Sequence, residues 1–139
     1  MSKKRCVDCA KEGITTRREA KYPGPRCATH HKQRLREQSR ARHGAHIEAT
    51  YGITADEYEA LYQAQGGVCA ICNRATGARR RLAVDHDHST GYVRGLLCRP
   101  CNHKVLGHLR DDPKALERAI NYLQNPPAFS VIGKRKAPE

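Results

Sequence analysis

Large apolar side chains are scarce in this sequence. It contains no Trp, one Phe and one Met, and Leu, Ile, Val and Phe together account for only 22 of its 139 residues. This share is about 16%, and highly charged chains in which it is below about 20% are usually disordered. A hydrophobic core alone is therefore too small to fold the chain, and another source of stability is needed.

Long apolar runs are also absent. No stretch approaches the ~18 apolar residues that a membrane-spanning helix needs, and the first residues, Met-Ser-Lys-Lys-Arg-Cys, lack the apolar segment of a secretory signal. We therefore expect an intracellular protein, and we exclude membrane proteins and secreted disulfide scaffolds. A length of 139 residues fits one domain, or one small domain with an appendage, rather than a large multidomain enzyme.

Acidic residues are few in comparison with basic ones. The chain has 26 Lys and Arg against 14 Asp and Glu, a formal charge of +12. The excess is +9 over residues 1–47, zero over 48–103 and +3 over 104–139. Such a field attracts polyanions, and nucleic acid is the first candidate. The alternative is a charged surface that only keeps the protein soluble.

The seven cysteines can supply the missing stability. Six of them form three Cys-x-x-Cys pairs, and in an intracellular protein such pairs more often bind metal than form disulfides. Two pairs separated by 25 residues can complete the tetrahedral ligand set of a closed structural zinc site, namely Cys69, Cys72, Cys98 and Cys101. Redox dithiols are the alternative, but no βαβ pattern surrounds either pair.

The remaining cysteines predict a second zinc site. Cys6, Cys9 and Cys27 need a fourth ligand, and either His30 or His31 can provide it. We interpret residues 1–31 as an N-terminal zinc-binding module and residues 32–50 as a solvated basic connector. The connector can be helical, but it lacks an apolar stripe, and Gly44 weakens the prediction of a helix.

The rest of the chain predicts a small α+β fold. Thr54 and Glu57 form a capping box that begins a helix, and Gly66-Gly67 ends it. Leu82–Val84 and Val93–Leu97 suggest two short strands around a turn. A short helix is expected over 102–109, and another from Pro113, with its buried face at Leu116, Ile120 and Leu123. Residues 126–139 are interpreted as a flexible basic tail.

Between the two later cysteine pairs lies the sequence Val84-Asp-His-Asp-His88. On a strand, Asp85 and Asp87 would point to one face and His86 and His88 to the other, unless a strand end or bend lets Asp85 and His86 converge. A carboxylate and the amide oxygen of Asn102 suit Mg²⁺, and a neutral histidine can accept a proton from water. A polar cluster on a solvated turn would also explain this pattern.

Several segments in this order resemble the recombination endonuclease VII family, phage nucleases of the wider HNH (ββα-metal, His-Me finger) group. The resemblance covers about residues 51–124 and is carried by Tyr51-Gly-Ile-Thr, Cys69-Ala-Ile-Cys72, Val84-Asp-His-Asp-His88, Thr90-Gly-Tyr-Val-Arg-Gly-Leu-Leu-Cys98 and Cys101-Asn102. It implies a zinc-stabilised ββα nuclease core flanked by helices, within a domain spanning residues 51–125.

The resemblance also implies roles for single residues. Asp85 and Asn102 would hold the catalytic Mg²⁺, for which Mn²⁺ can substitute. His86 would be the general base, and His88 would be a supporting polar residue near the scissile phosphate. Two positions depart from the pattern of some members: Ala83 stands where they have a histidine, and Val105 where they have an acid. The N-terminal module is not explained by the resemblance.

We therefore expect a Mg²⁺-dependent DNA endonuclease that resolves branched DNA, as a Holliday-junction resolvase does, or nicks duplex DNA. A homodimer would suit a junction, and a phage-encoded protein would act in the cytoplasm of a bacterial host. The alternative is a non-catalytic, zinc-dependent DNA-binding protein. The candidate DNA contacts are Arg79, Arg80, Arg81, Arg94, Arg99, Arg34, Arg36, Arg40 and Arg42.

Overall fold

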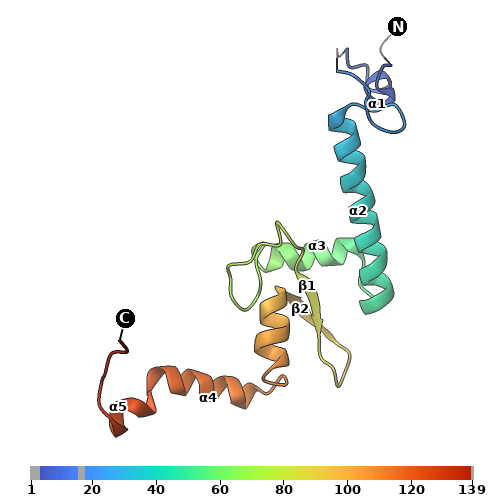
Figure 1. Ribbon diagram of the computed structural model, residues 1–139. Helices are drawn as coiled ribbons and strands as arrows, with labels where there is room; N and C mark the ends of the chain where they lie inside the picture. Colours follow the sequence, from blue (N-terminus) through green and yellow to red (C-terminus); the bar gives the residue numbers. More distant parts are fainter. Residues whose placement is uncertain (1–3, 16–17, 139) are drawn as a thin grey trace. The chain divides into compact units, whose positions relative to one another are not determined.

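The computed structural model describes residues 4–15 and 18–138 and confirms a small α+β protein (Figure 1). It divides into two compact units, Met1–Glu59 and Ala60–Glu139. Among the described residues, no helix is both long enough and apolar enough to cross a membrane. The elements, in chain order, are α1 (Val7–Lys11), α2 (Ala28–Tyr51), α3 (Ala55–Ala64), β1 (Ala83–His86), β2 (Val93–Leu97), the π-helix η1 (Pro100–Gly107), α4 (Pro113–Gln124) and α5 (Pro127–Val131).

The N-terminal part of the first unit is built around thiol groups. Its buried cluster consists of Cys6, Cys9 and Cys27, with Ala20 packed against them. Nε of Arg26 donates to the carboxylate of Asp8 at 2.6 Å, which ties the loop before α2 to α1. The core of this part is therefore made of metal-ligating residue types rather than of large aliphatic side chains.

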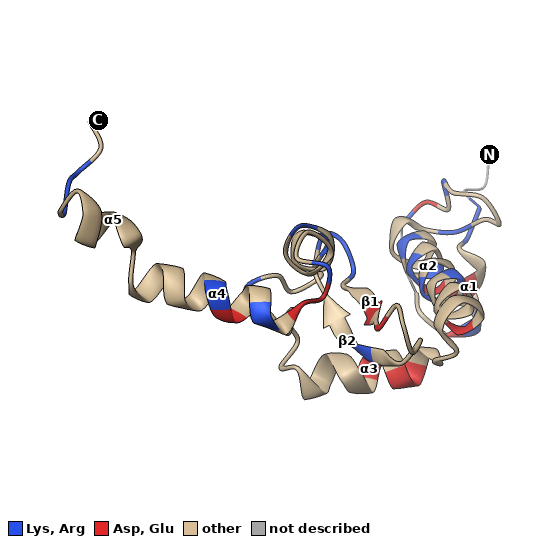
Figure 2. Ribbon diagram, turned by 90° about the horizontal axis from the view of Figure 1, so that it is seen from below, with Lys and Arg blue, Asp and Glu red and all other residues tan. Residues whose placement is uncertain are grey.

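Helix α2 includes residues 32–50 and runs through Gly44 without interruption. Gly44 is buried, and a Cβ atom there would lie 3.2 Å from the Cβ of Ala55 at the start of α3. The glycine therefore permits a close approach of the two helices, which outweighs its weak helix propensity. Most of α2 is exposed, as expected from the missing apolar stripe, and several of its residues are Lys or Arg, blue on the ribbon (Figure 2).

The capping box that begins α3 is confirmed. The backbone N–H of Thr54 donates to Glu57 at 2.7 Å, and the N–H of Glu57 donates to the Thr54 hydroxyl at 3.2 Å. Tyr58 on the same helix is buried, with its ring edge-on to His43 at a centroid distance of 4.8 Å.

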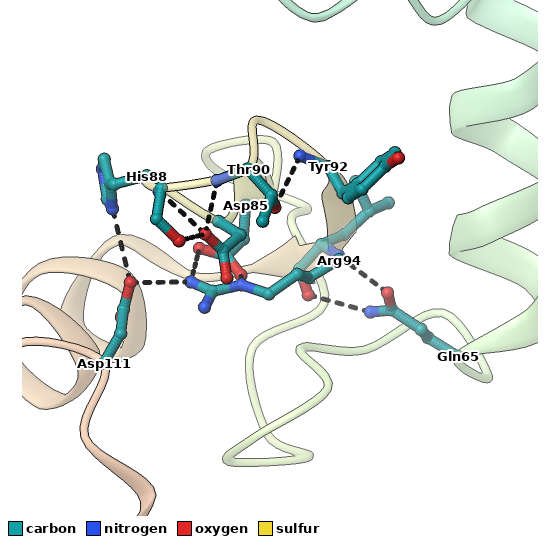
Figure 3. Close-up of polar contacts among 10 residues, drawn as sticks. Gln65, Asp85, His88, Thr90, Tyr92, Arg94 and Asp111 are labelled. Atoms are coloured by element: carbon teal, nitrogen blue, oxygen red, sulfur yellow. Dashed lines mark hydrogen bonds and ion pairs between the residues drawn. The ribbon is translucent and has the colours of Figure 1, made fainter.

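The second unit contains one antiparallel hairpin, in which β1 pairs with β2. Its buried side chains include Leu82, Val84, Leu96 and Leu97. Gln65 covers the outer edge of β2: its Oε1 accepts from the N–H of Leu96 at 2.8 Å, and its Nε2 donates to the Leu96 carbonyl at 2.9 Å (Figure 3). A side-chain amide thus takes the place of a third strand and satisfies the exposed backbone groups.

The elements after the hairpin agree in part with expectation. The predicted helix over 102–109 is present, but it runs over Pro100–Gly107 and is a π-helix. Asp112 caps α4 by accepting from the N–H of Lys114 at 2.9 Å. The predicted burial of the apolar face of α4 is wrong, because Ile120 is 55% and Leu123 77% exposed. Helical periodicity places apolar residues on one face, but it does not determine whether another element covers that face.

Candidate metal sites and active site

Four thiols meet where the hairpin joins η1. The Sγ atoms of Cys69, Cys72, Cys98 and Cys101 all lie within 4.8 Å of one another. Backbone hydrogen bonds at Ala75 and Arg74 lower the pKa of the Cys72 thiol to about 6 and so favour the thiolate that binds metal. The arrangement is consistent with a structural zinc site, which closes its tetrahedron with four protein ligands.

This cysteine cluster connects three segments of the second unit. Cys69 and Cys72 lie in the turn after α3, Cys98 directly follows β2, and Cys101 lies in the first turn of η1. The backbone N–H of Asn102 donates to the Cys98 carbonyl at 3.0 Å. A metal ion bound here would fix the hairpin against η1, and therefore fix the positions from which Asp85 and Asn102 project.

A second cluster of metal-ligating groups lies in the first unit. Nδ1 of His30 is 3.3 Å from the Sγ atoms of Cys6 and Cys9 and 3.4 Å from that of Cys27. His31 instead stacks on Tyr22 at a centroid distance of 4.5 Å. Of the two histidines that the sequence allowed, the structure places His30 among the thiols, and the set is consistent with a Cys₃His zinc site.

Glu12 supports this cluster from outside. Its Oε2 lies 3.0 Å from Nε2 of His30, the ring nitrogen that faces away from the thiols. A carboxylate in this position fixes the tautomer and the orientation of a ligating histidine and increases its basicity. Sequence reasoning missed Glu12, because cysteine spacing indicates ligands but not the groups that orient them.

Replacing Glu12 with Ala is expected to weaken zinc binding at the Cys₃His site by about 10–100-fold, the usual cost of losing such an outer partner. Competition between the protein and a chromophoric chelator measures the affinity of each site. Glu19→Ala is the matched control, since the Glu19 side chain is 50% exposed and forms a surface ion pair with Lys21 at 3.6 Å. An unchanged affinity in Glu12→Ala would show that the carboxylate has no part in the site.

The predicted active-site aspartate forms an ion pair in the hairpin. Asp85, on β1, is 4% exposed, and its carboxylate accepts two hydrogen bonds from Arg94, at 2.7 Å from Nε and 3.0 Å from Nη2. Nη2 also donates to Asp111 at 3.2 Å, so the guanidinium lies between two carboxylates (Figure 3). Asp111 belongs to the turn between η1 and α4 and was not singled out from the sequence.

A β-bulge explains how Arg94 reaches this position. Asp85 pairs with Gly95, but the next residue, His86, pairs with Val93, so Arg94 is an extra residue on β2. A bulge bends its strand and redirects a side chain, and bulges are frequent beside active sites. Simple strand alternation cannot predict this contact.

The two histidines of the motif lie together, although β1 ends at His86 and His88 belongs to the turn that follows. The rings of His86 and His88 have a centroid distance of 4.8 Å. Nδ1 of the exposed His88 lies 3.3 Å from the carboxylate of Asp111. Asp111 and the preceding Arg110 both have left-handed backbone conformations, with φ of +56° and +55°. Such conformations are costly for residues other than glycine and concentrate at functional sites.

Asp87 has a different role from Asp85. Its carboxylate accepts the side-chain hydroxyl of Ser89 and the backbone N–H groups of Ser89 and Thr90, at 2.5 to 2.9 Å. These hydrogen bonds, that of the Ser89 hydroxyl above all, hold the pKa of Asp87 well below its usual range. Asp87 therefore orders the hairpin turn, as aspartates often do.

The remaining candidate residues lie outside the Asp85–Arg94–Asp111–His88 network. Asn102 is on η1, directly after Cys101, and is half-buried. Arg79, Arg80 and Arg81 are exposed and line an open depression together with Arg74 and Arg99, beside Cys98. The four connector arginines, Arg34, Arg36, Arg40 and Arg42, are exposed on α2.

Comparison with known proteins identifies the family. Residues 44–125, more than half of the chain, match the model of recombination endonuclease VII. The chain belongs to the recombination endonuclease VII family. The matched residues include the four-cysteine cluster, the hairpin network and Asn102, whereas the N-terminal Cys₃His cluster lies outside them. Membership of this family indicates a DNA endonuclease and confirms the resemblance that the motifs suggested.

Two phage proteins are similar to this endonuclease VII family member over almost its whole length. The "Gene 59 protein" of Mycobacterium phage D29 is 57% identical over 136 residues, 98% of this chain and 82% of that protein. The "Gene 59 protein" of Mycobacterium phage L5 is 55% identical over 136 residues, 98% of this chain and 83% of that protein. Since 136 of 139 residues align, the similarity extends across the N-terminal module. No solved structure matches the chain.

Proposed function

We propose that this endonuclease VII family member is a Mg²⁺-dependent DNA endonuclease with an HNH-type ββα core, formed by the β1–β2 hairpin and η1. The observation that carries the proposal is the buried carboxylate of Asp85, which pairs with the guanidinium of Arg94. The same hairpin also carries His86. The four-cysteine cluster joins this hairpin to the helix that carries Asn102.

The chemistry around Asp85 fits a divalent cation. Asp85 and Asn102 offer the hard oxygen donors that Mg²⁺ prefers. The guanidinium of Arg94 pairs with both Asp85 and Asp111. These three side chains therefore carry one more negative than positive charge before a metal binds. A cation held by Asp85 and Asn102 would polarise the phosphate and stabilise the departing 3′ oxygen.

The protein side chains account for the remaining steps. His86 would be the general base that takes the proton of the attacking water, because a neutral imidazole accepts protons near physiological pH. His88, oriented by Asp111, would hydrogen-bond the phosphate. The products would carry 5′-phosphate and 3′-hydroxyl ends.

The basic face of α2 supports the assignment of DNA as the partner. Lys32, Arg36 and Arg40 recur every four residues and therefore lie along one stripe of the helix, and all three are exposed. Like charges four residues apart destabilise a helix, and a row of phosphates would remove that repulsion. The arginines around residues 79–81 would add phosphate contacts beside the four-cysteine cluster.

Nicking of supercoiled plasmid tests the proposal. The parent protein is expected to convert supercoiled plasmid to the open-circular form when Mg²⁺ is added, whereas Asp85→Asn and Asn102→Ala are expected to bind DNA but not to nick it. The metal-free control should omit Mg²⁺ rather than add a strong chelator, because a chelator would also remove structural zinc. Binding without any Mg²⁺-dependent nicking by the parent would favour the non-catalytic DNA-binding alternative.

Branched DNA is the proposed preferred substrate, and a homodimer would place two sites on opposing strands of a four-way junction. The same assay, run on a junction, a mismatched duplex and a linear duplex of equal length, tests this preference. Faster cleavage of the junction supports it, and equal rates on all three substrates would instead indicate a simple nicking enzyme.

A further inference from the structure

Arg94 hydrogen-bonds the carboxylate oxygens of Asp85 that the proposed catalytic cation would need as ligands. Both carboxylate oxygens of Asp85 accept from its guanidinium, at 2.7 and 3.0 Å, and the Asp85 side chain is only 5% exposed. A divalent cation that binds Asp85 would meet this positive charge directly, and the two would repel each other in a site with little water. Arg94 and the cation therefore compete for the same carboxylate.

The structure also offers Arg94 a second position. Nη2 already donates to Asp111, whose side chain is more exposed than that of Asp85, at 24% against 5%. Arg94 itself is 32% exposed and lies on the bulge, outside the regular pairing of the two strands. The guanidinium can therefore move from the buried carboxylate toward the solvent-facing one without breaking the hairpin.

One end of Arg94 remains available for an anion. Nε and Nη2 make the contacts to Asp85 and Asp111, whereas Nη1, with two N–H donors, donates to no acceptor among the described residues. A phosphate oxygen is a suitable acceptor for these donors, since guanidinium groups bind phosphates with two parallel hydrogen bonds.

We propose that Arg94 is an exchangeable counter-ion: it neutralises Asp85 before the divalent cation binds, and moves to Asp111 and a DNA phosphate when the cation takes its place. This inference rests on the proposed function. Arg94 thereby couples occupation of the metal site to binding of the substrate phosphate, and Asp111 is the positioning residue that keeps it near the site after exchange.

Binding of Mn²⁺ to the zinc-loaded full chain, measured without DNA by electron paramagnetic resonance, tests the exchange. Arg94→Gln removes the competing charge, so Mn²⁺ is expected to bind more tightly by about fivefold or more, the low end of coupling between sites. Turnover on plasmid is expected to fall in the same variant, because the phosphate contact is lost. Arg94→Lys, which keeps the charge without the fork of donors, is expected to bind Mn²⁺ with intermediate affinity.

Asp111→Asn provides the opposite change. Without Asp111, Arg94 has only Asp85 as a partner, and Mn²⁺ binding is expected to weaken. In the Arg94→Gln background this effect of Asp111→Asn should shrink, because only the direct attraction of Asp111 for the cation remains. The double-mutant cycle measures that difference, and additive effects would overturn the role given to Asp111.

Asp85→Asn separates failure of this inference from failure of the proposed function. If neither the parent nor Arg94→Gln binds Mn²⁺ better than Asp85→Asn, the metal site is absent and the proposed function fails. If Asp85→Asn abolishes binding but Arg94→Gln weakens it or leaves it unchanged, Arg94 only stabilises the hairpin, and the exchange alone is refuted.

Discussion

Replacing Cys101 with Ser is expected to release one zinc ion per chain and to unfold the unit that carries the hairpin. Among the described residues of that unit, the buried large aliphatic side chains are Leu82, Val84, Leu96 and Leu97. A structural zinc site can contribute about 10–16 kcal/mol at neutral pH, whereas a whole domain has a net stability of about 5–15 kcal/mol. Loss of this ion is therefore comparable with loss of the entire folding free energy of the unit.

Two measurements on Cys101→Ser check this expectation. Elemental analysis should give one zinc per chain in place of two, and amide resonances of β1, β2 and η1 should lose their dispersion. Plasmid nicking should also be lost, because the zinc ion no longer fixes the positions of Asp85 and Asn102 relative to each other.

The matched control is Cys27→Ser, which removes a thiol from the other cluster. This variant is also expected to lose one zinc, but the hairpin resonances should stay dispersed, since Cys27 belongs to the other compact unit. If Cys101→Ser keeps both a full complement of zinc and a folded hairpin, the four thiols do not form the structural site proposed here.

Features that depend on local chemistry were predictable from the sequence. The capping box at Thr54 and Glu57 and the cap at Asp112 each follow from a side chain and the backbone groups within three residues of it. The cysteine clusters were predictable for a related reason: two residues between thiols let both face one ion, and the four-ligand rule then joins distant pairs. Charge alone indicated a polyanionic partner.

Features that depend on packing between distant segments were not predictable. Gln65 contacts Leu96, 31 residues later, and Arg94 contacts Asp111, 17 residues later. No regular sequence spacing predicts either contact. The bulge at Arg94 interrupts the alternation of β2, so the contact of Arg94 with Asp85 on β1 does not follow from a regular strand pairing. The exposed face of α4 shows the same limit, since an amphipathic pattern does not reveal whether a partner element exists.

Replacing His86 with Ala is expected to lower the rate of plasmid nicking by about 10²–10⁴-fold, the usual contribution of a general base, while DNA affinity stays nearly unchanged. His86 belongs to β1, one residue from the buried Asp85, whereas His88 is exposed and lies outside the paired strands. His88→Ala is therefore the matched control, and it should lose less activity because a supporting hydrogen bond contributes less than proton transfer.

Chemical rescue distinguishes proton transfer from a structural role of His86. Imidazole added in solution can enter the space left by the His86→Ala substitution and accept the proton of the attacking water, so the rate should rise with imidazole concentration. The same addition should leave Asp85→Asn inactive, because imidazole cannot replace a carboxylate that holds the cation. A His86→Ala variant that nicks plasmid at the parent rate, with Mg²⁺ present, would remove His86 from the reaction and would require another base for the attacking water.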